Sequence, residues 1–81
     1  MQTNVTAVRV AGEVRAAMAR RGVSQTALAG ALGMSQAAVS RRLRGAIPLD
    51  VKELAAIAEI LGVPLSVLLA DAGQVTDSVA S

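Results

Sequence analysis

The sequence predicts a single all-α domain of four to five short helices. Three observations carry this prediction: the chain has 81 residues, enough for one core; it contains no Phe, Trp or Tyr; and seventeen of its residues are Ala. Because Ala is the strongest helix former and aromatic or β-branched runs are missing, helices are favoured over strands. The core must then consist of Leu, Val, Ile and Met, with Ala allowing the helices to approach closely.

Apolar residues recur at helical spacing along most of the chain. The expected helices are, in order, 5–21, 25–32, 36–44, 49–61 and a short one opened by Pro64. Gly12, inside the first of them, indicates either close packing or a later start of that helix. The residues expected to form the core are Val10, Val14, Ala17, Met18, Leu28, Ala29, Leu32, Met34, Val39, Leu43, Leu54, Ile57, Ala58, Leu61, Leu65, Leu68 and Leu69.

Glycine and serine mark the expected helix ends. Ser24 and Ser35 stand where the second and third helices begin, and each can accept a bond from an N–H group of the first turn. The glycines that follow a periodic segment, where left-handed backbone ends a helix, are Gly22, Gly45, Gly62 and Gly73. The domain is expected to span 1–73, and 74–81, which has no useful periodicity, to be a flexible tail.

The composition excludes several classes of function. Without Cys or His, the chain has no thiolate metal site, no cysteine nucleophile and not the commonest general base. We therefore expect no enzyme, metal, cofactor or small-molecule substrate. No signal peptide or membrane span is expected either, since the one long apolar stretch, 54–70, contains Glu59 and is broken at Pro64.

The charges are unevenly distributed along the chain. Residues 9–44 contain seven Arg and a single acidic residue, Glu13, whereas 45–81 contain Lys52 and five acidic residues. This asymmetry predicts one side that faces a polyanion and another that faces a different partner. An uneven but solvated surface would have the same charge pattern.

The segment 24–45 carries the most specific pattern. Two predicted helices, separated by a three-residue turn that starts with Gly33, are typical of a helix-turn-helix. Ala29 stands where the two helices would cross, with little room for a larger side chain. In the second of them, Val39 and Leu43 are the only large apolar residues, so the opposite side is small, polar and basic. Such a side suits a DNA groove better than a core.

With these residues in place, the sequence resembles the phage repressor and Cro-like (XRE-type) helix-turn-helix family over residues 8–69. The matching residues are Ser24-Gln25, Leu28-Ala29, Leu32-Gly33-Met34-Ser35, Val39-Ser40 and the later segment 54–63. The resemblance implies a compact four- to five-helix lambda-repressor-like domain with a helix-turn-helix.

One run departs from the family pattern. Arg42-Leu43-Arg44-Gly45 replaces the more usual aromatic or aliphatic residue followed by Glu before the Gly. A phosphate contact and a salt bridge to Glu13 or Glu53 are therefore alternative roles for Arg42.

The resemblance also implies which side chains contact DNA. Residues expected at base edges are Gln36, Ala37, Ser40 and Arg41, and residues expected at phosphates are Gln25, Ser35, Arg21, Arg42 and Arg44. Physical chemistry agrees, because helix N-termini bind anions, Arg pairs with guanine and Gln with adenine. Gln25 and Gln36 could instead be solvated first-turn residues. Ser35 caps a helix whether or not it binds phosphate. Arg21 stands at the end of its helix, where the helix dipole favours a cation even without DNA.

The expected function is sequence-specific binding of double-stranded DNA by a transcriptional regulator. A phage-type repressor or Cro-like protein fits, acting in the bacterial cytoplasm as a homodimer on operator half-sites. The loop before the fourth helix and residues 65–69 are the expected dimer contacts. The alternative is an antitoxin-like or anti-regulator module that keeps the fold for protein interaction, which the acidic, Leu-rich C-terminal half supports.

Overall fold

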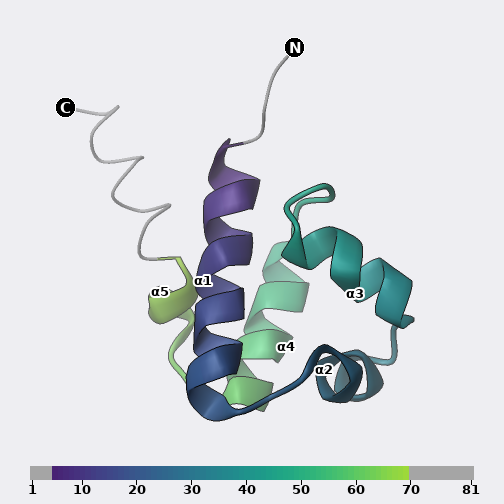
Figure 1. Ribbon diagram of the computed structural model, residues 1–81. Helices are drawn as coiled ribbons and strands as arrows, with labels where there is room; N and C mark the ends of the chain where they lie inside the picture. Colours follow the sequence, from purple (N-terminus) through teal and green to yellow (C-terminus); the bar gives the residue numbers. More distant parts are fainter. Residues whose placement is uncertain (1–4, 70–81) are drawn as a thin grey trace, which may run out of the picture.

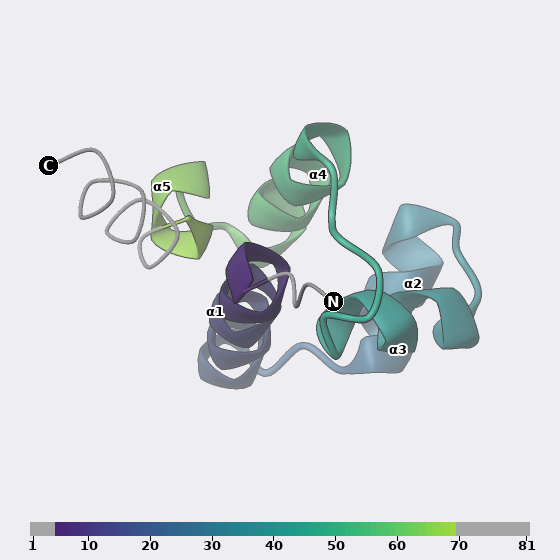
Figure 2. The same ribbon diagram turned by 90° about the horizontal axis from the view of Figure 1, so that it is seen from above.

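Five helices and no strand make up residues 5–69, the part of the chain that the computed structural model describes (Figures 1 and 2). They are α1 (Val5–Arg21), α2 (Gln25–Leu32), α3 (Gln36–Leu43), α4 (Val51–Leu61) and α5 (Leu65–Leu68). Helices α1 and α4 lie side by side, α5 packs on both, and α3 packs on α1 and α2. The prediction of an all-α fold is confirmed; Gly73 and the predicted tail, 74–81, lie outside the described residues.

Serine caps begin the two helices of the helix-turn-helix, as the sequence predicts. The Ser24 hydroxyl accepts a hydrogen bond from the Ala27 N–H at 3.0 Å, and the Ser35 hydroxyl accepts one from the Ala38 N–H at 3.1 Å. Between them, Gly33 ends α2 with a φ of 68°. Each cap satisfies an N–H group that the helix itself leaves without a partner.

Helix α4 begins two residues later than the sequence predicts, at Val51 instead of position 49. The reason is a capping box. Asp50 has extended backbone and accepts a hydrogen bond from the Glu53 N–H at 2.7 Å, while the Glu53 carboxylate accepts one from the Asp50 N–H at 3.0 Å. Asp50 is therefore the N-cap of α4, and Glu53 is held in place by the helix start.

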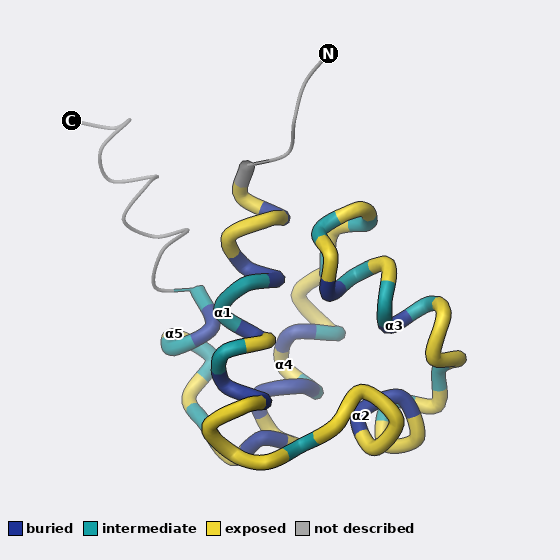
Figure 3. Tube along the Cα trace, in the orientation of Figure 1, coloured by how far each residue is buried: buried dark blue, intermediate teal, exposed yellow. Residues whose placement is uncertain are grey.

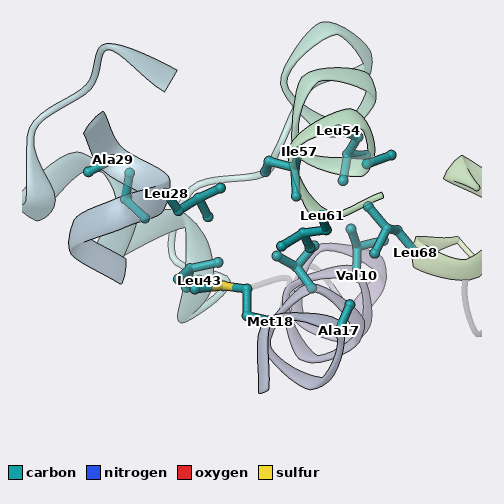
Figure 4. Packing of buried hydrophobic residues seen from close by; sticks show 13 residues of the cluster. Val10, Ala17, Met18, Leu28, Ala29, Leu43, Leu54, Ile57, Leu61 and Leu68 are labelled. Carbon is teal, nitrogen blue, oxygen red and sulfur yellow. The ribbon is translucent and has the colours of Figure 1, made fainter. Parts of the chain in front are cut away.

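One hydrophobic core joins all five helices (Figure 3), and the side chains in Figure 4 converge from α1, α2, α3 and α4, with Leu68 of α5 at one side. Every residue that the sequence assigns to the core is buried or packs against it; Leu32, Met34, Leu65 and Leu69 are partly buried. Ala7 and Ala11 are also buried on α1, a consequence of its close approach to neighbouring helices.

Two glycines lie inside helices and have room for a side chain. A Cβ added at Gly12 would meet only the Arg15 Nη2 atom, at the ordinary distance of 3.7 Å, and one at Gly30 would have no neighbour within 4 Å. Gly12 is therefore neither a helix start nor a close approach, the two alternatives that the sequence left open.

Gly12→Ala and Gly30→Ala are each expected to raise the free energy of unfolding by about 0.5–1 kcal/mol, because Ala loses less backbone entropy in a helix than Gly. Urea unfolding measures the change. Gly33→Ala is the matched control: its φ of 68° disfavours Ala, so this variant should be less stable than the wild type. Destabilisation by either helical substitution would contradict the prediction.

Candidate nucleic-acid interface

The turn between α2 and α3 fixes how the two helices meet. The Met34 N–H donates to the Ala29 carbonyl at 3.0 Å, which closes the turn onto the end of α2. Ala29 is buried, as are Val39 and Leu43 on the inner side of α3. The inner side of α3 is thus anchored on the core, and its outer side is held at a defined angle to α2.

The outer face of α3, which we define as Gln36, Ala37, Ser40 and Arg41, brings together all four residues expected at base edges. Gln36, Ala37 and Arg41 are exposed and Ser40 is half-buried; Ala37 and Arg41 lie opposite the buried pair of α3, and Gln36 and Ser40 flank them. The arrangement presents one amide, one methyl group, one hydroxyl and one guanidinium side by side, which is a set that can read base edges in a major groove.

Gln36 is oriented by a residue that the sequence reasoning missed. Its Nε2 atom donates to the Thr26 hydroxyl oxygen. A glutamine amide carries a second N–H and an acceptor oxygen, so one donor and one acceptor of Gln36 are left for a ligand. Thr26 is the second residue of α2 and Gln36 the first of α3, so this bond also joins the N-terminal turns of the two helices.

The joined N-termini of α2 and α3 have the chemistry of an anion-binding site. Gln25 and Ser35, both predicted to bind phosphate, are exposed at these two turns. The Ser35 hydroxyl oxygen accepts a hydrogen bond from the Ala38 N–H of its own helix. Its O–H group is left as a donor. Since both helix dipoles direct partial positive charge to this place, an anion is favoured there.

The arginines differ in what they already contact. Arg41 makes no side-chain hydrogen bond or ion pair with another described residue, whereas the Arg44 Nη1 atom donates to the Ser40 hydroxyl at 2.7 Å. Both are exposed. Arg41 therefore presents its guanidinium with every donor available. The side chain of Arg44 instead points back along α3 towards Ser40.

Arg21 and Arg42 are directed towards α4 instead of the outer face of α3. The Arg21 Nη2 atom donates to the Gly62 carbonyl, just after α4, at 3.1 Å. The Arg42 Nε atom forms a salt bridge of 3.1 Å with the Glu53 Oε2 atom. Of the two carboxylates that the sequence offered to Arg42, Glu13 and Glu53, Glu53 is the partner.

Arg15 was not among the predicted site residues, although it supports the site. Its Nη1 atom donates to the Leu43 carbonyl at the end of α3. A cation at the C-terminus of a helix is favoured by the helix dipole and satisfies a carbonyl that the helix leaves open. The contact links residues 28 positions apart, so helical spacing alone could not have found it.

Metal sites and membrane spans are not found in the part of the chain that the structure describes. Residues 5–69 contain no group of three or more His, Cys, Asp or Glu side chains that could hold a metal ion. Within the same range, none of the helices has the length and apolar character needed to cross a membrane.

Comparison with known proteins agrees with this geometry. A family model described as helix-turn-helix matches residues 14–68, more than half of the chain and all of α2 to α5. No curated protein and no solved structure shows significant similarity to the chain. On the strength of the family match, the chain belongs to the helix-turn-helix family of DNA-binding regulators.

Proposed function

We propose that this protein is a sequence-specific regulator of transcription that places α3 in the major groove of double-stranded DNA, as a phage-type repressor or Cro-like protein does. The observation that carries the proposal is the outer face of α3. It is small, polar and basic, three of its four residues are exposed, and it stands on a helix that Val39 and Leu43 anchor in the core. A rigid helix with such a face has the properties that base readout requires.

Each residue of the outer face has a chemical role in the proposal. Arg41 donates two parallel hydrogen bonds to the O6 and N7 atoms of a guanine, and Gln36 pairs with an adenine through its free donor and acceptor. Ala37 contacts a thymine methyl group, and Ser40 bonds whichever base edge lies beside it.

Phosphate contacts fix the register of the protein on the duplex. We assign them first to Gln25 and Ser35 at the joined N-termini of α2 and α3, and to Arg44 at the exposed end of α3. Arg42 would have to leave the Glu53 carboxylate before it could bind phosphate, and Arg21 already uses one of its N–H groups on the Gly62 carbonyl. Their contribution to affinity is therefore smaller than a count of arginines suggests.

The protein is proposed to bind as a homodimer on half-sites about one helical turn apart, because a single small module rarely binds tightly enough. Leu68 of α5 is fully buried within the chain, whereas Val51, directly after the loop that precedes α4, is 72% exposed. This contrast favours the loop before α4 over α5 as the dimer contact. A footprint of one asymmetric half-site with one chain bound would contradict the dimer.

Selection of bound sequences from a random duplex pool tests the proposed function. It is expected to yield one enriched site, with its symmetry and spacing, and binding to any duplex should weaken steeply with salt as counterions are released. Failure to select a site, together with no retention on heparin or random DNA at low salt, would favour a protein-interaction module that keeps the fold.

Arg41 and Arg44 are expected to give different signatures when replaced by Ala. Arg41→Ala should weaken binding to the selected site by about 1–3 kcal/mol and relax the preference at one base pair, as a lost bidentate contact does. Arg44→Ala should weaken all duplexes about equally and reduce the salt slope by about one, as a lost phosphate contact does.

Equilibrium titrations of the selected site, of single-base variants and of a random duplex, each at several salt concentrations, separate the two signatures. Neither variant should unfold, since both residues are exposed; thermal melting by circular dichroism checks this. If the two variants exchanged signatures, the register of α3 in the groove would differ by about one turn from the proposal.

A further inference from the structure

Helix α3 packs on α1 and α2 but does not approach α4. No Cα atom of α3 lies within 8 Å of a Cα atom of α4, whereas α1 and α2 both come that close to α3. With eight residues and two buried side chains, α3 has a small packed surface. Its orientation relative to α4 is therefore set indirectly, through the core that both helices share with α1 and α2, and by side chains that reach from α3 to α4.

Arg42 and Glu53 form a polar contact of this kind. The Arg42 Nε atom lies 3.1 Å from the Glu53 Oε2 atom, and the two side chains are only 20% and 21% exposed. Among the residues that the structure describes, this salt bridge is the one that joins α3 to α4. Water and dissolved salt weaken the attraction within a partly buried ion pair less than within an exposed one.

Both ends of the bridge are fixed by other bonds. The second carboxylate oxygen of Glu53, Oε1, accepts from the Asp50 N–H at 3.0 Å in the capping box. The Arg42 Nη1 atom donates to the Ala38 carbonyl within α3 at 3.0 Å. The two side chains are therefore already ordered by their own helices, so little further conformational entropy is lost when they pair.

We propose that Arg42 and Glu53 are positioning residues for DNA recognition. Their bridge sets the orientation of α3, so that Glu53, which lies outside the two helices and turn of the segment 24–45, determines sequence specificity. The proposal rests on the proposed function. Arg41 is the neighbour of Arg42 in α3, so a rotation of the helix moves its guanidinium directly.

Specific and non-specific DNA binding differ in how much rotation of α3 they tolerate. Direct readout needs contact atoms held to within about 0.5 Å and 10–20°, whereas phosphate contacts carry no sequence information and are supplied by flexible side chains. Loss of the bridge therefore lowers the ratio of specific to non-specific affinity more than it lowers non-specific affinity.

A double-mutant cycle of Arg42→Met and Glu53→Gln tests the proposal. Met keeps much of the apolar stem of Arg42, and Gln can still accept from the Asp50 N–H in a capping box. The matched controls are Arg20→Met on α1 and Glu59→Gln on α4, both at exposed positions with no side-chain bond to a described residue. The measurements are the Kd values for the selected site and for a random duplex, with melting curves to establish that each variant is folded.

Each single variant is expected to lower the ratio of specific to non-specific affinity roughly 5- to 150-fold, the range that one bidentate base contact carries. The double variant should lower it no further than the more affected single variant, because both changes remove the same bridge. Arg42→Lys, which keeps the charge next to Glu53, should restore part of the ratio; should Arg42→Met melt early, Glu53→Gln alone carries the test. The two controls should leave the ratio unchanged.

Two results would overturn the positioning role. The first is a ratio that stays at the wild-type value in folded variants of both residues. The second is uniform weakening on both duplexes in Arg42→Met, with a smaller salt slope, together with uniform tightening in Glu53→Gln; this would identify Arg42 as a phosphate contact that Glu53 restrains. A wild-type protein that binds both duplexes equally would instead overturn the proposed function, and the positioning role with it.

Discussion

Replacing Gly45 by Ala is expected to lower the free energy of unfolding by about 2–5 kcal/mol, the sum of a backbone cost and a packing cost. The φ of Gly45 is +80°, a left-handed conformation that disfavours any residue with a Cβ atom. A Cβ atom built there would also lie 3.0 Å from both the Cα and the Cγ2 atoms of Val8 in α1. Because one of the two atoms belongs to the backbone, relief would require α1 and the loop after α3 to separate.

Gly22→Ala separates the two contributions to this loss. Gly22 has a φ of +70°, yet a Cβ atom there would have no neighbour within 4 Å, so only the backbone cost of about 1–2 kcal/mol is expected. Chemical denaturation of both variants gives the difference. Adding Val8→Ala to Gly45→Ala should recover only part of the stability, since the clash with the Val8 backbone remains. Equal losses at the two glycines would show that the approach of Val8 does not constrain the loop.

Truncation of Leu28 to Ala is the other change with a large expected effect, a loss of about 2–5 kcal/mol in the free energy of unfolding. Leu28 is 0% exposed and belongs to the core cluster that joins all five helices (Figure 4). Its removal leaves a cavity beneath α2, the helix on which α3 packs. A chain of this length has a total stability of roughly 4–12 kcal/mol, so the variant should also bind DNA poorly at physiological temperature.

Leu28→Met provides the matched control, because it changes shape while keeping volume and should cost less than about 1.5 kcal/mol. Leu65→Ala gives a second comparison: Leu65 is only partly buried, so its truncation should cost less than that of Leu28. Urea denaturation and thermal melting measure the stability of all three variants. A Leu28→Ala protein as stable as the Leu28→Met protein would mean that α2 is held mainly by other contacts.

The arginines of the basic half differ in the partners that they already have. Arg15 and Arg21 donate to backbone carbonyls, and Arg42 pairs with Glu53. These three guanidinium groups link helices, and the charge of one of them, Arg42, is paired with a carboxylate. Arg41 differs from them, because it has no such partner among the described residues and lies on the outer face of α3.

The sequence by itself determined the features that depend on near neighbours along the chain. The helices, their apolar faces and the serine caps of α2 and α3 were predicted from residues at most a few positions apart, because helix periodicity and capping act over one or two turns. The outer face of α3 was predictable for the same reason: once Val39 and Leu43 face the core, helical geometry places Ala37 and Arg41 on the other side, with Gln36 and Ser40 at its flanks. The sequence prediction placed the start of α4 two residues too early. It took Asp50 and Glu53 for acidic residues of the first turn, whereas Asp50 is the N-cap of a capping box. The two patterns use the same residue types at nearly the same positions.

Only the tertiary structure decided which groups meet across the chain. A guanidinium can pair with any carboxylate or carbonyl in reach, so spacing along the sequence left Arg42 with more than one partner until the packing of the helices brought Glu53 to it. Gly45 was predictable as a helix end, but the approach of Val8, which closes the space beside it, follows from how α1 lies against the loop. Such contacts depend on interhelical distances and angles, which result from the packing of the whole core and are not encoded in any local stretch of the sequence.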